Sequence, residues 1–220
     1  DGACATPKEL LEQASELGVT MLGVPEELGG VMVEQSTVTS VLIGEALAHG
    51  DMGIAVAALA PGAVATTIGR WGDAEQQARY LPAFTGDDAP AAALALLESR
   101  PLFDPSKPET RAKRDGDEWV LRGVKSLVPR AADAELFVVG ADADGIGPAL
   151  FVVESSTEGV FTEPEPAMGV RAAATGKLVL EDVRLPASAL LADGAAEAYA
   201  DVVQRARIGW CALAVGTAQA

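Results

Sequence analysis

The sequence predicts an α+β protein of several domains, and three observations carry this prediction. Apolar residues recur with helical spacing through residues 1–90, and they alternate as in strands through residues 91–190. Helical spacing returns over residues 191–220. We therefore expect a helical N-terminal domain, an antiparallel β-barrel or sandwich as the middle domain, and the first helix of a C-terminal helical bundle.

The N-terminal segment predicts four helices. The stretch "PKELLEQASEL" places apolar residues on one side of a short helix, and Gly18 follows as its C-terminal glycine. Ser36 or Thr37 is expected to cap a second helix that runs to about His49. Its inward-facing residues are expected to be Val38, Val41, Leu42 and Leu47.

The other two predicted helices differ from each other in composition. The stretch "MGIAVAALAPGAVATTIGRWG" is rich in Ala and Gly and predicts a helix buried on most sides. Pro61 lies inside it and is expected to kink or interrupt the helix, because proline has no N–H to donate. Asp73 is expected to cap the short polar helix that follows.

Turn signals divide the middle segment into strands. Asp115–Gly116 and Asp144–Gly145 each separate two apolar runs, which is the short-range signal of a hairpin. The stretch "TGKLVLEDVRLP" alternates Leu178, Leu180 and Val183 and predicts a further strand.

Composition excludes several classes of function. A net charge of −16 and a pI near 4.3 would repel a phosphate backbone, so nucleic acid is not expected as a partner. No apolar run reaches the roughly 20 residues of a membrane span, and no secretory signal is visible, so we expect a cytoplasmic protein. With only Cys4, Cys211 and His49 available, neither a metal site nor a histidine-based triad is expected.

Four stretches resemble one known family. They are "ELGVTMLGVPEELGG", "IGRWGDAEQQARYLPAFTGDD", "GDEWVLRGVKSLV" and "MGVRAAATGKLVLEDVRLP", and their order and spacing resemble those of the acyl-CoA dehydrogenases. The resemblance spans essentially the whole chain but covers only the first two domains of that family and the first helix of the third. It implies α,β-dehydrogenation of an acyl-CoA thioester with FAD as hydride acceptor. It also implies assembly into dimers or tetramers, with like or unlike chains.

The resemblance also identifies positions where a flavin would be bound, and here the chain departs from the family. Residues 97–104, "LESRPLFD", take the place of the family's "TEPxAGSD". Leu97 replaces its threonine, Ser99 its proline and Phe103 its serine. The resemblance also implies that Phe103 lies at a substrate-binding position. In a second flavin segment, Leu127 and Pro129 replace an aromatic residue and a hydroxyl residue. Hydrogen-bond donors along a flavin set its affinity and potential, so these losses bear on function.

The last helix carries the remaining candidates. Arg207 resembles an arginine that some family members place directly after a catalytic glutamate, but the preceding residue here is Ala206. No catalytic base is therefore expected in this chain, and Arg207 is expected at most to support catalysis or bind substrate. Gln204 falls where several members place an acid that touches the pantetheine of CoA.

The sequence is also compatible with two functions other than that of an enzyme. Leu97, Phe103, Pro129 and Ala206 also fit a non-catalytic, flavin-deficient partner subunit of a heteromeric acyl-CoA dehydrogenase. An acidic interaction module unrelated to CoA is the third reading, and it would bind neither flavin nor thioester.

Overall fold

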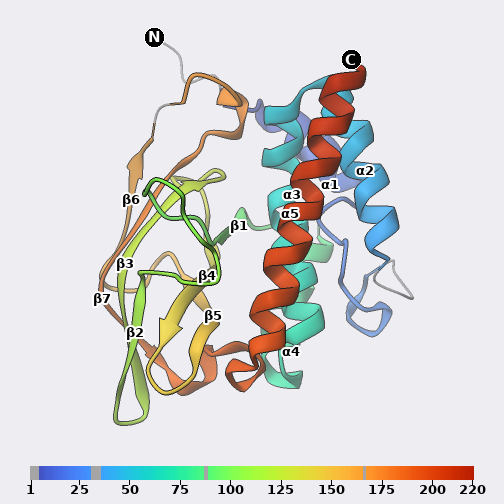
Figure 1. The fold of residues 1–220 in the computed structure, drawn as a ribbon. Coiled ribbons are helices and arrows are strands. Elements are labelled where there is room, and N and C mark those ends of the chain that lie inside the picture. The colour runs from blue at the N-terminus through green and yellow to red at the C-terminus, as the bar shows by residue number, and fades with distance from the viewer. Residues whose placement is uncertain (1–4, 31–35, 87–88, 166) are drawn as a thin grey trace. The chain divides into compact units, whose positions relative to one another are not determined.

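The computed structural model describes residues 5–30, 36–86, 89–165 and 167–220 (Figure 1). Cys4 lies outside these residues. The chain forms two compact units. The helical unit comprises Asp1–Pro90, Pro166–Ala174 and Gln204–Ala220, and the sheet unit comprises Ala91–Glu165 and Thr175–Val203.

The helical unit contains α1 (Lys8–Glu16), α2 (Thr37–Gly50), α3 (Met52–Trp71) and α4 (Ala74–Tyr80). Their ends follow the local signals in the sequence. The Ser36 hydroxyl accepts a hydrogen bond from the N–H of Thr39, and Asp73 and Gln76 form a reciprocal capping box. Gly18 follows α1 with φ of 78°, a left-handed conformation that glycine adopts without strain.

Helix α3 is the core of the helical unit. Its small side chains allow close contact with neighbouring backbone, and a Cβ placed on Gly62 would lie 2.5 Å from the carbonyl oxygen of Val19. Pro61 is buried within α3 and does not interrupt it. In the described part of the chain α3 alone has the length and apolar composition of a membrane span, but 67% of that window is buried, as in the core helix of a globular unit.

The predicted inward face of α2 is wrong in part. Val38 and Leu42 are exposed, at 68% and 60% of their surface, whereas Gly44 and Ala48 are buried. The second half of α5 (Ala196–Gln219) passes this small-residue side of α2, and a Cβ on Gly216 would lie 2.1 Å from the carbonyl oxygen of Glu45. Close helix contact therefore selects the small residues of α2 instead of its large ones.

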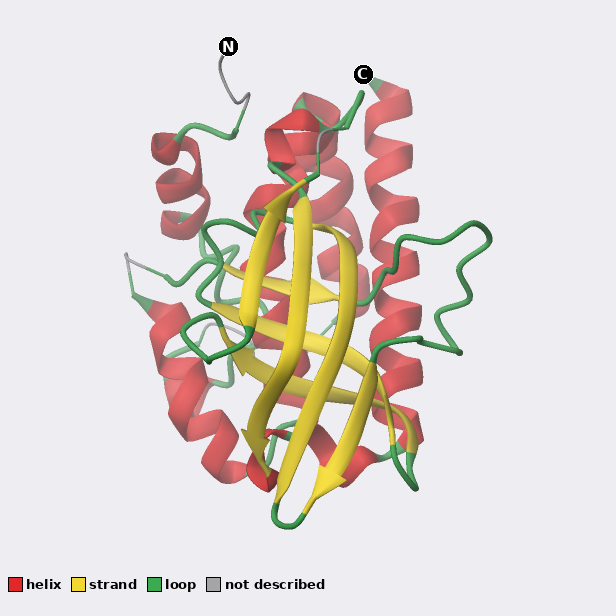
Figure 2. Ribbon diagram, turned by 90° about the vertical axis from the view of Figure 1, so that its left-hand side faces the viewer, coloured by secondary structure: helices red, strands yellow, loops and turns green. Residues whose placement is uncertain are grey.

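The sheet unit is one curled sheet of seven strands. They are β1 (Ala92–Ala95), β2 (Arg111–Asp115), β3 (Glu118–Val128), β4 (Leu136–Ala143), β5 (Gly147–Glu154), β6 (Val160–Pro164) and β7 (Gly176–Pro186). The pairing order is β1-β4-β2-β3-β7-β6, with β5 beside β4. Figure 2 shows the long strands β3 and β7 side by side. Both predicted hairpins form, with Gly116 and Gly145 at positive φ.

The predicted fold class is confirmed, with one refinement in the sheet. Strand β4 pairs parallel with both β1 and β2, so the sheet is mixed and not wholly antiparallel. Apolar side chains at alternate positions along the strands form its core, among them Trp119, Phe137 and Phe151. Short 3-10 turns complete the chain: η1 (Glu26–Leu28), η2 (Leu81–Thr85), η3 (Arg171–Ala173), η4 (Ala187–Ala189) and η5 (Leu191–Gly194).

Candidate functional site

The two segments with substituted flavin positions meet at the end of β1. The backbone N–H of Ser126, near the end of β3, donates a 3.0 Å hydrogen bond to the carbonyl oxygen of Leu97. This bond places the chain around Leu97 beside the chain around Leu127. Both leucines remain exposed, at 38% and 45% of their surface.

Glu98 holds the long turn after β1 closed. Its carboxylate accepts hydrogen bonds from the N–H of Glu109 at 2.7 Å and from the N–H of Thr110 at 2.9 Å. The Thr110 hydroxyl donates a third bond, at 2.7 Å. Because Glu98 precedes the turn and Glu109 follows it, one buried carboxylate joins the two ends.

Lys125 completes this cluster. Its ammonium lies 2.7 Å from Oε1 of Glu98, and its side chain has no exposed surface. Burial opposes ionisation of Glu98, but the hydrogen bonds from Lys125 and the two backbone amides outweigh it, so the pKa of Glu98 is lowered. Burial likewise lowers the pKa of Lys125, and Glu98 opposes that shift. Lys125 and Glu98 therefore form a buried ion pair.

A β-bulge shapes the second segment. The register of β3 against β7 shifts between Lys125 and Val128, and Leu127 adopts a left-handed conformation there, with φ of 52°. Glu165 binds this bulge with both carboxylate oxygens. It accepts a 2.6 Å hydrogen bond from the Ser126 hydroxyl and another of 2.6 Å from the N–H of Leu127.

The turn after β1 is braced along its length. Arg100 forms a 3.0 Å ion pair with Glu109 and donates to the carbonyl oxygen of Lys107 at 2.9 Å. The Arg100 guanidinium also lies 5.3 Å from the centre of the Phe103 ring. Asp104 accepts hydrogen bonds from the N–H and the hydroxyl of Ser106 and so fixes this part of the turn. Contacts of Arg100 and Asp104 thus hold the turn after β1 in one conformation.

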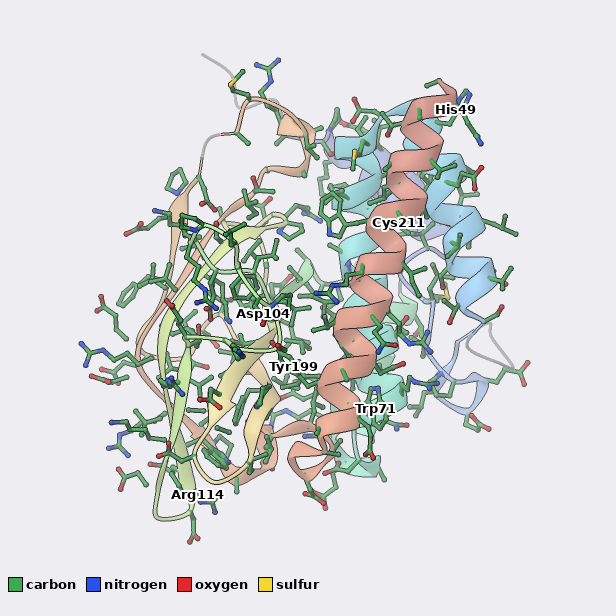
Figure 3. The ribbon with its side chains drawn as sticks, viewed as in Figure 1. His49, Trp71, Asp104, Arg114, Tyr199 and Cys211 are labelled. Atoms are coloured by element: carbon green, nitrogen blue, oxygen red, sulfur yellow. The ribbon has the colours of Figure 1, made fainter. Side chains whose placement is uncertain are left out.

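Tyr199, at the start of α5, anchors the same turn. Its hydroxyl donates a 2.6 Å hydrogen bond to the carbonyl oxygen of Pro105, and Figure 3 shows it beside the part of the turn that carries Asp104. Burial, with the nearby charges of Glu98 and Asp104, raises the pKa of Tyr199, so the phenol stays protonated as a donor.

Removal of this anchor should weaken the fold. Tyr199→Phe is expected to lower the free energy of unfolding by about 1 kcal/mol, because the carbonyl of Pro105 loses its partner while the ring is kept. Denaturant unfolding of the full-length protein measures this loss. An unchanged free energy would mean that water replaces the phenol at no net cost.

Leu102 carries backbone strain at the tip of the turn. It has φ of 55° and is 99% exposed, so a large apolar residue occupies a left-handed position with nearly all of its surface open to solvent. The left-handed conformation costs an L-residue roughly 1–2 kcal/mol, and glycine avoids that cost.

Leu102→Gly is therefore expected to raise the free energy of unfolding by up to about 1 kcal/mol, after allowance for the greater unfolded-state entropy of glycine. Leu17→Gly is the matched control, since Leu17 is also exposed, at 79%, but has an ordinary φ of −74°. The control should destabilise the protein. A loss of stability in both variants would contradict the strain argument.

The predicted site residues divide between the two units. Leu97, Ser99, Phe103, Leu127 and Pro129 all belong to the sheet unit, around the turn after β1 and the end of β3. Gln204 and Arg207 lie on α5 within the helical unit, and both are exposed. Their roles toward a substrate stay predictions.

Sequence reasoning missed three residues that organise this region. Thr110 and Glu165 bind the turn and the bulge, and Tyr199 anchors the turn from α5. Thr110 is a buried polar residue directly before β2, but its burial is known only from the structure. No local pattern marks Glu165 or Tyr199.

The side chains at the substituted flavin positions offer few hydrogen-bond donors to a flavin. Leu97 and Leu127 supply no side-chain donors, and Pro129 has neither a side-chain donor nor an N–H. The N–H of Leu127 is already bound to Glu165. FAD would therefore have to be held by other backbone groups and the exposed hydroxyl of Ser99, with leucine side chains nearby. Within the described residues no group of three His, Cys, Asp or Glu side chains could hold a metal ion.

Comparison with known proteins gives a consistent result. The family model described as "Acyl-CoA dehydrogenase, N-terminal domain" matches residues 1–87, and "Acyl-CoA dehydrogenase, middle domain" matches residues 93–183. The short/branched chain specific acyl-CoA dehydrogenase of Bos taurus is 31% identical over 220 residues, which cover 96% of this chain and 50% of that protein. This chain thus spans about half the length of such relatives.

Two solved structures are similar in fold and sequence. A glutaryl-CoA dehydrogenase from Mycobacterium smegmatis in complex with FADH2 has a TM-score of 0.82 and 31% identity, over 97% of this chain and 55% of that one. An acyl-CoA dehydrogenase from Bacillus anthracis complexed with FAD has a TM-score of 0.82 and 33% identity, over 96% of this chain and 37% of that one.

Proposed function

Because this chain belongs to the acyl-CoA dehydrogenase family, we propose that its full-length protein carries out α,β-dehydrogenation of an acyl-CoA thioester with FAD. The observation that carries the proposal is the junction of the two flavin segments, where the N–H of Ser126 binds the carbonyl oxygen of Leu97. Similar structures hold FAD or FADH2. When bound, FAD accepts the hydride that leaves Cβ of the thioester.

The residues of this chain serve that reaction mainly by position. The left-handed residues Leu102 and Leu127 give the turn and the bulge their shape, and Glu98 and Tyr199 hold the turn in place. Ala206 offers no proton acceptor, so the base that removes the α-proton is proposed to come from outside these 220 residues. Gln204 and Arg207 are proposed to contact the substrate.

The same proposal bears on assembly. A flavin shared between subunits predicts dimers or tetramers, formed by like or unlike chains. A cytoplasmic location stays a prediction of the sequence.

A second candidate is a flavin-deficient partner subunit of a heteromeric acyl-CoA dehydrogenase. The loss of donors at Leu97 and Pro129, and the use of the Leu127 N–H by Glu165, favour this reading. Each lost hydrogen bond removes about 0.5–1.5 kcal/mol of binding, and several together lower affinity by orders of magnitude.

Visible absorption of the purified full-length protein separates the two candidates. The paired bands of oxidised flavin in the protein alone would support the enzyme. A colourless protein that becomes yellow only after co-expression with its genomic neighbour would identify a partner subunit. A protein without flavin in either preparation would contradict both readings.

A further inference from the structure

We propose that Glu98 and Lys125 act as a positioning pair, which fixes segment 97–104 against segment 126–129 so that both face a bound flavin in one geometry. The inference rests on the proposed function. Neither side chain is expected to touch the flavin, because Glu98 is only 8% exposed and Lys125 is fully buried.

Glu98 closes the turn that follows β1. The three bonds from Glu109 and Thr110 to the Glu98 carboxylate measure between 2.7 and 2.9 Å. Thr110 is itself buried against β3, since a Cβ on Gly123 would lie 2.6 Å from the Thr110 hydroxyl oxygen. The turn therefore starts and ends on one carboxylate, and its far end also rests on β3.

Lys125 and Ser126 link this turn to the β-bulge of β3. Lys125 reaches Glu98 from the position directly before the register shift that contains Leu127. The adjacent Ser126 binds the carbonyl oxygen of Leu97, directly before Glu98. Two connections, one ionic and one through the backbone, thus join the same two segments within two residues of the left-handed Leu127.

The buried ion pair of Glu98 and Lys125 is better suited to fix the geometry of the two segments than to add stability. A buried ion pair gains little net stability, because the attraction between its charges is offset by the loss of hydration. It does require one geometry, since each buried charge is costly without its partner. Here the single carboxylate has four donors around it, one on Glu109, two on Thr110 and one on Lys125, so it joins the far end of the turn to β3.

The test uses the full-length protein and the variants Glu98→Gln and Lys125→Met. Flavin fluorescence, recorded well below the unfolding temperature, gives the dissociation constant for added FAD, and hydrogen exchange follows the amides of Glu109 and Thr110. We expect about a tenfold or greater rise in the dissociation constant, together with faster exchange at these amides. Arg184→Gln removes exposed ion pairs with Asp115 and Glu118 in the same sheet and should change neither quantity.

Two further variants separate positioning from stability. Glu98→Gln with Lys125→Met leaves no buried charge, so its unfolding temperature should recover relative to Lys125→Met while FAD binding stays weak. Recovery of affinity along with stability would overturn the proposal. If the first variants fail to fold, Thr110→Val removes one donor and keeps the pair, and it should weaken FAD binding and accelerate exchange at Glu109.

The exchange measurement is independent of the proposed function. If the wild-type protein binds no FAD, the proposed enzyme fails, and faster exchange at Glu109 and Thr110 in Glu98→Gln would still support closure of the turn. If Glu98→Gln folds and keeps wild-type FAD affinity and wild-type exchange, the positioning pair is refuted while the proposed function stands.

Discussion

Lys125→Met is expected to lower the free energy of unfolding of the full-length protein by about 3–5 kcal/mol, because removal of one partner leaves a buried charge uncompensated. Glu98 would keep its three other donors but lose the ammonium 2.7 Å away. Chemical denaturation of the variant and the wild type at pH 8 measures the difference.

The effect should depend on pH with a definite sign. In the wild type the pKa of Glu98 lies below its ordinary 4.5, so its contribution is complete above that pH and is lost only in more acidic solution. In the variant, burial without Lys125 should raise the pKa of Glu98. The variant therefore loses stability as pH rises from about 4.5 through that raised pKa, and its deficit should be smaller at pH 5 than at pH 8.

Arg184→Gln serves again as the control, because its partners Asp115 and Glu118 are exposed and their pairing with Arg184 is screened by solvent. It should have a far smaller effect than Lys125→Met at both pH values. A deficit in Lys125→Met that is equal at pH 5 and pH 8 would show that Glu98 does not titrate in the variant.

The parts of the fold that could be predicted from the sequence depend on short-range chemistry. Caps at Ser36 and Asp73 and the hairpin glycine Gly116 act within a few residues, so local patterns mark them. The inward face of α2 could not be assigned, because large apolar residues occur on both its exposed side and its packed side. The parallel pairing of β4 with β1 and β2 brings together strands separated along the chain, and no local signal encodes that choice.

The candidate site depends even more on contacts between residues far apart in the sequence. Lys125 pairs with Glu98, which is 27 residues away, and Glu165 is 38 residues from the backbone N–H whose hydrogen bond it accepts. Tyr199 reaches across 94 residues to Pro105. The substituted flavin positions were visible in the sequence. The contacts that brace this turn, such as that of Phe103 with Arg100, are seen only in the structure.

Added FAD is expected to stabilise the full-length protein by about 2.7 kcal/mol at a hundredfold excess over its dissociation constant, because a ligand that binds only the folded state shifts the unfolding equilibrium. Thermal unfolding of flavin-free protein with and without FAD measures this gain.

The same measurement on the double variant Leu97→Thr with Phe103→Ser tests whether the turn after β1 binds flavin with its present residues. Since Phe103 packs on Arg100 within a braced turn, the double change removes a contact of about 0.5–1 kcal/mol, so it should not increase the stabilisation by FAD. A clear increase would mean that the hydroxyls restore a decayed flavin site, and it would favour the partner-subunit reading over the enzyme.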